Sequence, residues 1–311
     1  MMMYEMDKHQ IIVGNGAAEL LYAICRLPGY TGAFVPAPGF SEYKEALEAS
    51  KIPVRDIFYR PREDDNGKPY FEVPYLALET FAAELKGQDG RIIVFLGNPN
   101  NPDGTLLDKD HIRTVASMLK DANSLLVIDE SFIDFVGNDP LQENEHSMRS
   151  LVNEFDNIIV VHSFTKFYAV PGLRIGAAFA NETLITQLQQ YIPSWSVNTL
   201  AQAYTKAALN DVDYIKRTKQ ELNEERAFMY NALDDIEGIT VYPPSANFML
   251  FQVNQEGITA NYINEELKKY NMIVRNCDSY VGLTNHWVRI AIKDHDTNIK
   301  LVDKLTNILK V

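Results

Sequence analysis

Short apolar runs alternate with helical patterns through the first two thirds of the chain. Apolar runs of roughly four to eight residues between turn formers are typical of buried strands, whereas apolar residues three and four apart indicate helices. Because these runs mainly alternate with helices, the pattern predicts a doubly wound α/β fold, a seven-stranded and mostly parallel sheet with helices on both faces. The seven strands are expected near residues 11–13, 33, 53–59, 91–96, 124–128, 158–161 and 175–180.

The pattern changes after a charged stretch at 213–235, which is expected to be a long helix with a solvated face that bridges two domains. A large domain is therefore expected at 1–212 and a smaller α+β domain at 213–311. Between the early strands, residues 60–70 are predicted to form a polar loop. Residues 108–120 have helical spacing, and Asp108 is predicted to cap the N-terminus of this helix. In the smaller domain, strands are expected at 239–242, 248–253, 272–275 and 287–292, and helices at 259–270 and 297–309.

The bulk composition limits the classes of partner and compartment. A chain of 311 residues that is 46% hydrophobic can form two such domains. Its formal net charge of −13 argues against nucleic acid or an anionic membrane surface as a partner, but not against a small anionic substrate. Cys25 and Cys277 form no disulfide or metal-binding pattern, and there is no signal peptide and no apolar run of the roughly 18 residues that span a membrane. A cytoplasmic location is therefore expected.

The sequence around Lys166 places an amine beside an anion-binding pattern. Lysine is mostly a surface residue, yet Lys166 lies between two apolar runs. Ser163 comes three residues earlier and Arg174 eight residues later, and the Pro171-Gly172 turn is expected to bring Arg174 back toward the amine. Pyridoxal 5′-phosphate requires an amine for its aldehyde and a held phosphate. The alternative is a surface lysine and arginine that flank an ordinary turn.

Two further segments fit the same cofactor. The strand at 11–13 runs into a Gly14-Asn15-Gly16 turn and a helix, so the backbone N–H groups of Ala17 and Ala18 would point at an anion. Phe40 follows a strand end, where an aromatic ring can stack on a flat cofactor. The alternatives are a plain strand-to-helix turn and a core phenylalanine under a loop.

Polar residues also follow consecutive core strands. Asn101 lies in the loop after the strand at 91–96, and Asp129 and Lys166 follow the next two strands. Open α/β sheets bind ligands at the carboxyl ends of their strands. A carboxylate buried at Asp129 needs a cationic partner, which a protonated pyridine nitrogen would provide. The alternative for Asp129 alone is a helix cap or turn residue.

Two arginines lie in apolar strands of the smaller domain. A buried guanidinium at Arg275 or Arg289 would require a paired anion. A substrate carboxylate or phosphate would serve, and the alternative is a structural ion pair with one of the many acidic residues.

Three motifs, in this order and spacing, resemble those of pyridoxal-phosphate enzymes of the aspartate-aminotransferase fold type, in the class I and II aminotransferase family. They are Asn98-Pro-Asn-Asn-Pro102, Asp129-Glu130 and Ser163-Phe-Thr-Lys166 with Pro171-Gly-Leu-Arg-Ile-Gly176. The resemblance covers nearly the whole chain from Gly14 onward. It is greatest to the branch that holds L-threonine-O-3-phosphate decarboxylase of cobalamin synthesis and histidinol-phosphate aminotransferase.

The resemblance implies a role in cofactor binding for most of the candidate residues. Lys166 would form the covalent link to the cofactor and later move protons, and Asp129 would pair with the pyridine nitrogen. Asn101 would hydrogen-bond the ring hydroxyl, and Phe40 would stack on the ring. The cofactor phosphate would be held by Ser163, Arg174, Gly16 and the amides of Ala17 and Ala18.

For the substrate, the resemblance implies that Arg289 binds an anionic group, Arg275 a phosphate, and that Asn101 also takes part. Phe132 stands where aminotransferases usually carry a tyrosine, and this favours the decarboxylase branch, as does the segment 275–283. The first hypothesis is decarboxylation of L-threonine O-3-phosphate to 1-aminopropan-2-yl phosphate. The alternatives are transamination of histidinol phosphate or another amino acid, and an inactive relative that binds the cofactor.

The family's sites lie at a subunit interface, so the resemblance also implies a homodimer. Family members normally carry several dozen residues before the Gly14 turn, which form an arm over the site. This chain begins close to that turn. The start is therefore expected to be truncated, or the site to be closed in another way.

Overall fold

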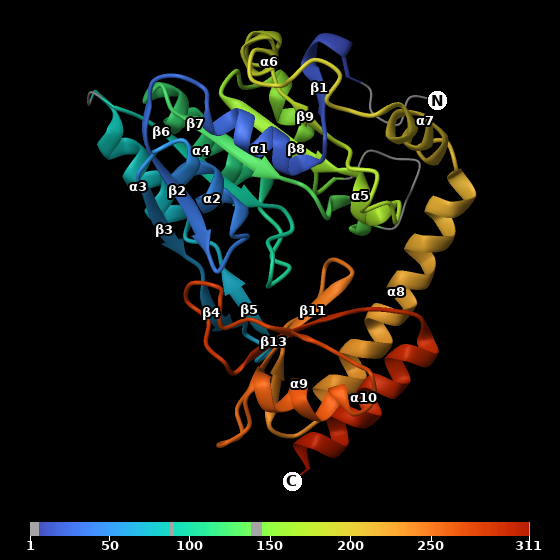
Figure 1. Cartoon of the computed structure of the whole chain (residues 1–311). Helices are drawn as coiled ribbons and strands as arrows, with labels where there is room; N and C mark the ends of the chain where they lie inside the picture. The colour runs from blue at the N-terminus through green and yellow to red at the C-terminus, as the bar shows by residue number, and fades with distance from the viewer. Residues whose placement is uncertain (1–5, 88–89, 138–144, 311) are drawn as a thin grey trace.

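A computed structural model describes residues 6–87, 90–137 and 145–310 and confirms the seven predicted strands (Figure 1). They form one sheet in the order β1-β9-β8-β7-β6-β2-β3. Only the two ladders that β9 makes, with β1 and β8, are antiparallel, so the described sheet is mostly parallel as predicted. The strands are β1 (Ile11–Gly14), β2 (Tyr30–Ala37), β3 (Val54–Phe58), β6 (Arg91–Gly97), β7 (Leu125–Asp129), β8 (Ile158–Ser163) and β9 (Gly176–Phe179).

Helices cover both faces of this sheet. Successive residues of a strand point to opposite faces, and Leu126 and Ile128 accordingly lie in one buried cluster while Leu125 and Val127 lie in the other. The helices of this part are α1 (Ala17–Cys25), α2 (Glu42–Ala49), α3 (Tyr75–Leu85), α4 (Lys109–Asp121), α5 (Phe164–Phe167), α6 (Glu182–Gln189) and α7 (Thr199–Ala208), with 3₁₀ turns η1 (Lys8–Gln10), η2 (Ile133–Phe135) and η3 (Arg149–Asn153).

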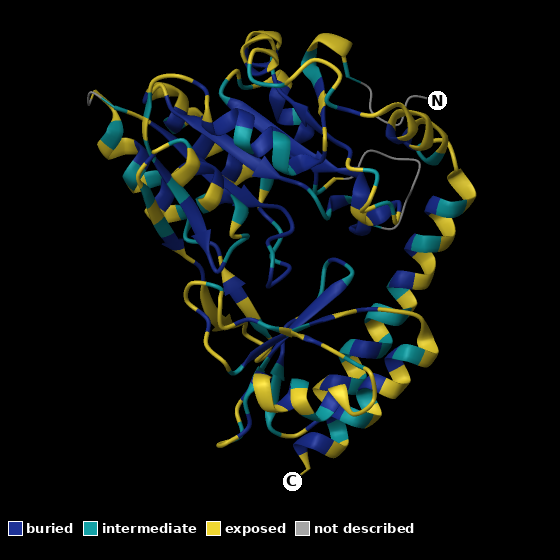
Figure 2. Ribbon diagram, viewed as in Figure 1, coloured by how far each residue is buried: buried dark blue, intermediate teal, exposed yellow. Residues whose placement is uncertain are grey.

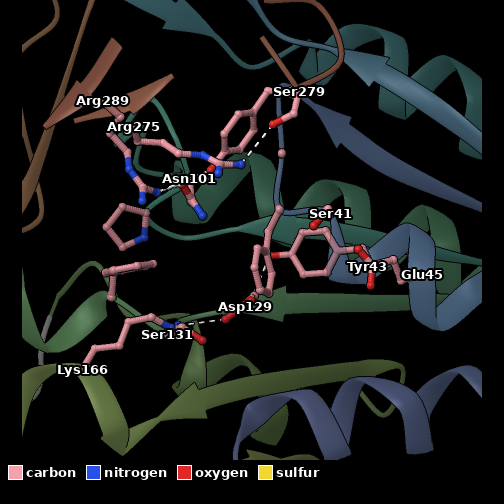
Figure 3. A pocket seen from close by; sticks show the side chains of 15 residues that line it. Ser41, Tyr43, Glu45, Asn101, Asp129, Ser131, Lys166, Arg275, Ser279 and Arg289 are labelled. Carbon is pink, nitrogen blue, oxygen red and sulfur yellow. Dashed lines mark hydrogen bonds between the residues drawn. The ribbon is translucent and has the colours of Figure 1, made fainter. Parts of the chain in front are cut away.

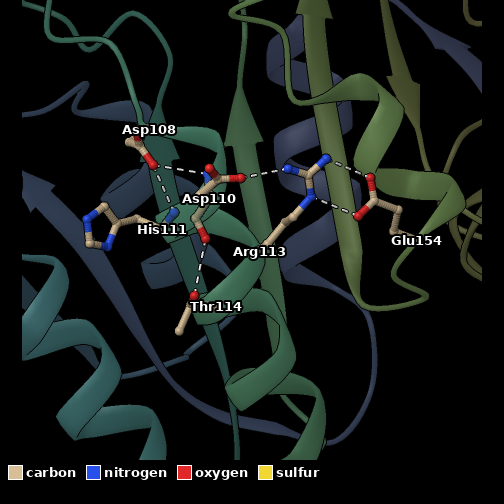
Figure 4. A network of polar contacts seen from close by, with 6 residues as sticks. All are labelled: Asp108, Asp110, His111, Arg113, Thr114 and Glu154. Carbon is tan, nitrogen blue, oxygen red and sulfur yellow. Dashed lines mark hydrogen bonds and ion pairs between the residues drawn. The ribbon is translucent and has the colours of Figure 1, made fainter.

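The start of α4 illustrates how local chemistry sets an element (Figure 4). The carboxylate of Asp108 accepts hydrogen bonds from the backbone N–H groups of Asp110 and His111, at 3.0 and 2.9 Å, which confirms the predicted N-cap. Arg113 then bridges the helix to Glu154, with 2.9 Å between Nε and Oε2. Because this ion pair is exposed to solvent, it contributes little to stability.

A second, antiparallel sheet has the order β10-β11-β13-β12 and is packed against helices (Figure 1). The predicted strand at 272–275 is largely wrong, because only Arg275 and Asn276 pair, at the edge beside β13. The domain boundary placed after residue 212 stays a prediction. The elements are α8 (Val212–Asp234), β10 (Ile239–Val241), β11 (Phe248–Val253), α9 (Ala260–Lys268), β12 (Arg275–Asn276), β13 (Trp287–Ala291) and α10 (His295–Leu309).

The long helix α8 runs from the large sheet to the small one, as the charged stretch predicted (Figure 1). Figure 2 shows that most of its surface is exposed or half-buried, while the strands of both sheets are mostly buried. None of the helices within 6–87, 90–137 and 145–310 has both the length and the apolar character needed to cross a membrane.

The prediction of a polar loop at 60–70 is wrong, because this segment contributes to a hairpin of β4 (Arg60–Glu63) and β5 (Pro69–Glu72). Every residue of β4 is exposed, so the segment lacks the apolar alternation that marks a strand. The hairpin is anchored by Phe71, whose ring centroid lies 5.0 Å from that of Tyr242 and 5.5 Å from that of Trp287. One aromatic residue thus joins the hairpin to the small sheet.

We expect Phe71→Ala to lower the free energy of unfolding by about 3–5 kcal/mol, because it removes a buried ring and leaves a cavity. Urea unfolding followed by tryptophan fluorescence, to which Trp287 contributes, would measure the loss. The matched control is Tyr70→Ala on the same hairpin, where the side chain is 44% exposed and a change of about 0.5 kcal/mol or less is expected. Equal losses in the two variants would contradict the anchoring role of Phe71.

Candidate active site

A cavity of about 650 Å³ lies between the carboxyl ends of the large sheet's strands and the small sheet (Figure 3). Parallel strands end at one edge of a sheet, and this edge is where ligands bind in open α/β folds. Seven of the residues singled out in the sequence line this cavity: Phe40, Asn101, Asp129, Phe132, Lys166, Arg275 and Arg289.

Asp129 is the last residue of β7 and is only 5% exposed. Its carboxylate accepts hydrogen bonds from the Tyr43 hydroxyl and from the backbone N–H of Ser131, both at 2.9 Å. Burial raises the pKa of Tyr43 well above its ordinary value, and the Asp129 charge raises it further, so the phenol stays protonated and donates. These two bonds hold the carboxylate in a fixed position at the cavity wall.

Tyr43 was missed in the sequence. It lies three residues after Phe40, in the first turn of α2, and its ring stacks on Phe95 with 5.2 Å between centroids. The centroid of Phe40 lies 5.6 Å from it, edge to face. Its position three residues after Phe40 was the one feature of the sequence that could have indicated it. Its bond to Asp129 joins residues 86 positions apart, so no local pattern predicts it.

Lys166 lies on α5, the short helix that directly follows β8. Its Nζ lies 4.6 Å from the ring centroid of Phe132, a cation–π contact. Although the side chain is accessible within the open cavity, the walls displace enough water to lower the pKa of its amine. The Asp129 charge opposes this shift, while Arg174 and Arg289 add to it. A lowered pKa increases the neutral, nucleophilic fraction of the amine.

The glycine turn and Ser163 meet at the level where β1, β9 and β8 pair. Gly176 pairs with Gly14 on one side and with Ser163 on the other. A Cβ on Gly176 would lie 2.7 Å from the backbone nitrogen of Ala17, so glycine is needed for α1 to approach this closely. No side chain caps the N-terminus of α1, which leaves its first N–H groups, those of Ala17 and Ala18, pointing out of the helix.

Arg174 returns to the same place, in a left-handed conformation with φ of 55°. Gly16 has φ of 84°, a left-handed conformation that residues with side chains rarely adopt, and a Cβ there would also press against Arg174 Nη2. Gly16, Ala17 and Arg174 are thus close together beside Ser163, although none of them lines the cavity itself. Arg174 nevertheless lies near enough to lower the pKa of Lys166.

On the opposite wall, Arg275 and Arg289 face each other directly across β12 and β13. Like charges in such cross-strand positions repel each other. Among the described residues, no carboxylate forms an ion pair with either guanidinium, and their partners are neutral. The alternative raised from the sequence, an ion pair of either arginine with an acidic residue, is therefore not found in the described part of the chain. The expectation of buried guanidinium groups is wrong for Arg275, which is exposed on its two-residue edge strand, and is met only in part by Arg289, which is half-buried.

Asn101 joins the two walls. Its Oδ1 accepts hydrogen bonds from Arg289 Nη1 and, at 3.1 Å, from the hydroxyl of Tyr280. Because the carbonyl oxygen is occupied in this way, the amide N–H₂ of Asn101 is the group that remains for a ligand. Asn101 can thus donate to an acceptor in the cavity.

A lowered lysine pKa carries a pH-dependent stability cost. The folded chain binds the Lys166 proton less tightly than the unfolded chain, whose lysine has its ordinary pKa near 10.5. The cost is full below the lowered pKa and disappears as the pH rises through the unfolded value. Without cofactor, Lys166→Met should therefore gain stability relative to wild type at about pH 7 and lose part of that gain at about pH 10.

Urea unfolding at the two pH values would measure this change. The control is Lys216→Met on the exposed face of α8, where a change within about 0.5 kcal/mol is expected at either pH. If the stability gained in Lys166→Met is the same at both pH values, the lowered pKa of Lys166 is contradicted.

Comparison with known proteins agrees with this geometry. Residues 3–305 match the sequence family of class I and II aminotransferases. The chain is 32% identical over 306 residues to the adenosylcobalamin biosynthesis bifunctional protein CobDQ of Leptospira interrogans, a match that covers 98% of this chain but 33% of that protein. It is 31% identical over 300 residues to the threonine-phosphate decarboxylase of Salmonella typhimurium, with 96% of this chain and 77% of that one covered.

Among solved structures, the histidinol-phosphate aminotransferase from Clostridium acetobutylicum superposes with a TM-score of 0.84 at 25% identity. The superposition covers 97% of this chain and 84% of that one. The chain therefore belongs to the class I and II aminotransferase family and is a pyridoxal-phosphate-dependent enzyme, a carboxy-lyase or an aminotransferase.

Proposed function

We propose that this enzyme decarboxylates L-threonine O-3-phosphate to 1-aminopropan-2-yl phosphate. The observation that carries the proposal is the pair Arg275 and Arg289, directly opposed and without carboxylate partners in the described residues, in a cavity that also holds Lys166 and Asp129. A substrate with both a carboxylate and a phosphate would neutralise the two guanidinium groups. The similarity to proteins named for this activity supports the same substrate.

The residues present fit pyridoxal phosphate. At Gly176 a Cβ would lie 2.7 Å from the Ala17 backbone nitrogen, and Gly16 has φ of 84°, so glycine at these two positions allows the cradle to form. We propose that the cradle, with Ser163 and the amides of Ala17 and Ala18, holds the phosphate. Lys166, Asp129, Asn101 and Phe40 would hold the aldehyde, the ring nitrogen, the ring hydroxyl and the ring face.

When bound, the cofactor supplies a protonated ring that absorbs the electron pair left at Cα when one of its bonds breaks. Asp129 keeps a negative charge at the ring nitrogen, and Tyr43 and Ser131 hold that charge in place. Arg289 and Arg275 fix the substrate's anionic groups, so they determine which bond at Cα is aligned for cleavage. The Lys166 side chain, in its protonated ammonium form, would then give a proton to Cα and return to the neutral amine.

Transamination of histidinol phosphate is the second candidate. Histidinol phosphate has a single anionic group, which would leave one of the two arginines without a partner during that half of the reaction. Its imidazole, however, would find a carboxylate in Glu45, which also lines the cavity. A dicarboxylate amino donor or acceptor would engage both arginines. The intact set of Lys166, Asp129 and Arg174 argues against an inactive relative.

Carbon dioxide release separates the two reactions. The purified enzyme with pyridoxal phosphate is expected to release carbon dioxide from O-phospho-L-threonine at the same rate with and without 2-oxoglutarate. Amino transfer from histidinol phosphate to 2-oxoglutarate, with no carbon dioxide from O-phospho-L-threonine, would overturn the proposal in favour of the second candidate.

We expect Arg289→Ala to lower kcat/KM for O-phospho-L-threonine by about 100-fold, since it removes a partly buried charge contact to the substrate. Steady-state kinetics of carbon dioxide release would measure it. Arg217→Ala, on the exposed face of α8, removes the same charge away from the cavity and should leave kcat/KM within about two-fold of wild type. A similar loss in both variants would mean that the general charge, and not this contact, matters.

A further inference from the structure

We infer that Ser279 is a specificity-determining residue, whose hydroxyl acts with the Arg275 guanidinium to bind the distal phosphate of the substrate. Ser279 lies in the turn after β12 and lines the cavity (Figure 3). The inference rests on the proposed function in one respect, that the substrate is a phosphorylated amino compound. It does not depend on which bond of that substrate breaks.

The hydrogen bond between Arg275 and Ser279 leaves hydrogen-bond donors on both side chains for an anion. Arg275 Nη2 donates to Ser279 Oγ at 3.0 Å, so the serine oxygen is used as an acceptor. Its own O–H then remains to donate, and within the described ranges no group accepts it. The other N–H groups of the guanidinium lie next to it. A phosphate, with three terminal oxygens, can accept from a hydroxyl and a guanidinium at once.

The turn that carries Ser279 is fixed on both sides. The N–H of Tyr280 donates to the Cys277 carbonyl at 3.1 Å, and the N–H of Asp278 donates to Asn276 Oδ1 at 2.9 Å. The Tyr280 ring lies beneath Arg275, with 5.7 Å between the ring centroid and Cζ. Its hydroxyl reaches Asn101 on the opposite wall. Ser279 is therefore held in place before any ligand binds, which reduces the entropy cost of binding.

Arg289 and Arg275 are assigned to different ends of the substrate. Arg289 contacts Asn101 and is close enough to Lys166 to lower the pKa of that amine, so an anion on Arg289 lies near the reacting carbon. Arg275 occupies the edge strand and contacts Ser279. The carboxylate end is therefore assigned to Arg289 and the distal phosphate to Arg275 and Ser279.

The test compares two ligands in three variants of the holoenzyme. Dissociation constants for O-phospho-L-threonine and L-threonine would be measured from the change in cofactor absorbance on binding. Ser279→Ala is expected to weaken binding of O-phospho-L-threonine by about ten-fold, the cost of one hydrogen bond to a charged group, and to leave L-threonine binding unchanged. Ser279→Thr keeps the hydroxyl and should retain most of the preference for the phosphorylated ligand.

Tyr280→Phe is the matched control from the neighbouring position. It removes a hydroxyl that contacts Asn101 and Arg289 but keeps the ring under Arg275. It should therefore weaken binding of both ligands alike and leave their ratio unchanged. A purely structural role for Ser279 predicts the same result for Ser279→Ala, so the ratio of the two dissociation constants separates the roles.

The outcomes also distinguish this inference from the proposed function. If the wild type prefers O-phospho-L-threonine and Ser279→Ala keeps the same preference, the role of Ser279 is refuted but the proposed function is not. Wild type that binds the two ligands equally would refute the phosphorylated substrate and the inference with it. Failure of Ser279→Thr to keep the preference, in a variant with wild-type thermal stability, would also count against the hydroxyl.

Discussion

The parallel register of β6, β7 and β8 fixes where the proposed catalytic groups lie. Gly97 at the end of β6 pairs with Asp129 at the end of β7, and Asp129 pairs with Val161 near the end of β8. The segments that follow these strands leave the sheet at the same edge, so Asn101 in the loop after β6 and Lys166 in the helix after β8 line one cavity. If β7 were shifted by one residue relative to its neighbours, Asp129 would point to the other face of the sheet.

The adjacent acids Asp129 and Glu130 show how this register separates chemistry from support. Asp129 faces the cavity, whereas Glu130 is buried and accepts bonds from the Ser147 hydroxyl and the Met148 N–H, both at 2.6 Å. Burial raises the pKa of Glu130, while these donors act to lower it. Asn98 donates to the same carboxylate at 3.1 Å, which ties the loop after β6 to the end of β7. Glu130 thus supports the position of its neighbours.

The two walls of the cavity are held together by contacts between the sheets. Asn101 on the large side binds Arg289 and Tyr280, and the Ser245 hydroxyl binds the carbonyl of Gly104. From α8, Arg226 donates to the carbonyls of Phe135 and Ser245, one on each side. The geometry of the substrate arginines therefore depends on how the small sheet docks on the large one, as well as on their own strands.

The sequence alone was enough to predict the seven strands, the N-cap at Asp108 and the positions of Asp129 and Lys166 after core strands, because periodicity, capping and strand-end motifs are local properties. The roles of the two residues toward the cofactor stay predictions. The hairpin around Phe71 was missed because most of its sequence is polar and Phe71 packs on two aromatic residues that are distant in the sequence. Tyr43, Ser279 and Tyr280 were missed for a related reason. The bond from Arg289 to Asn101 joins residues 188 positions apart, and such partners are decided by packing between elements that no local pattern encodes.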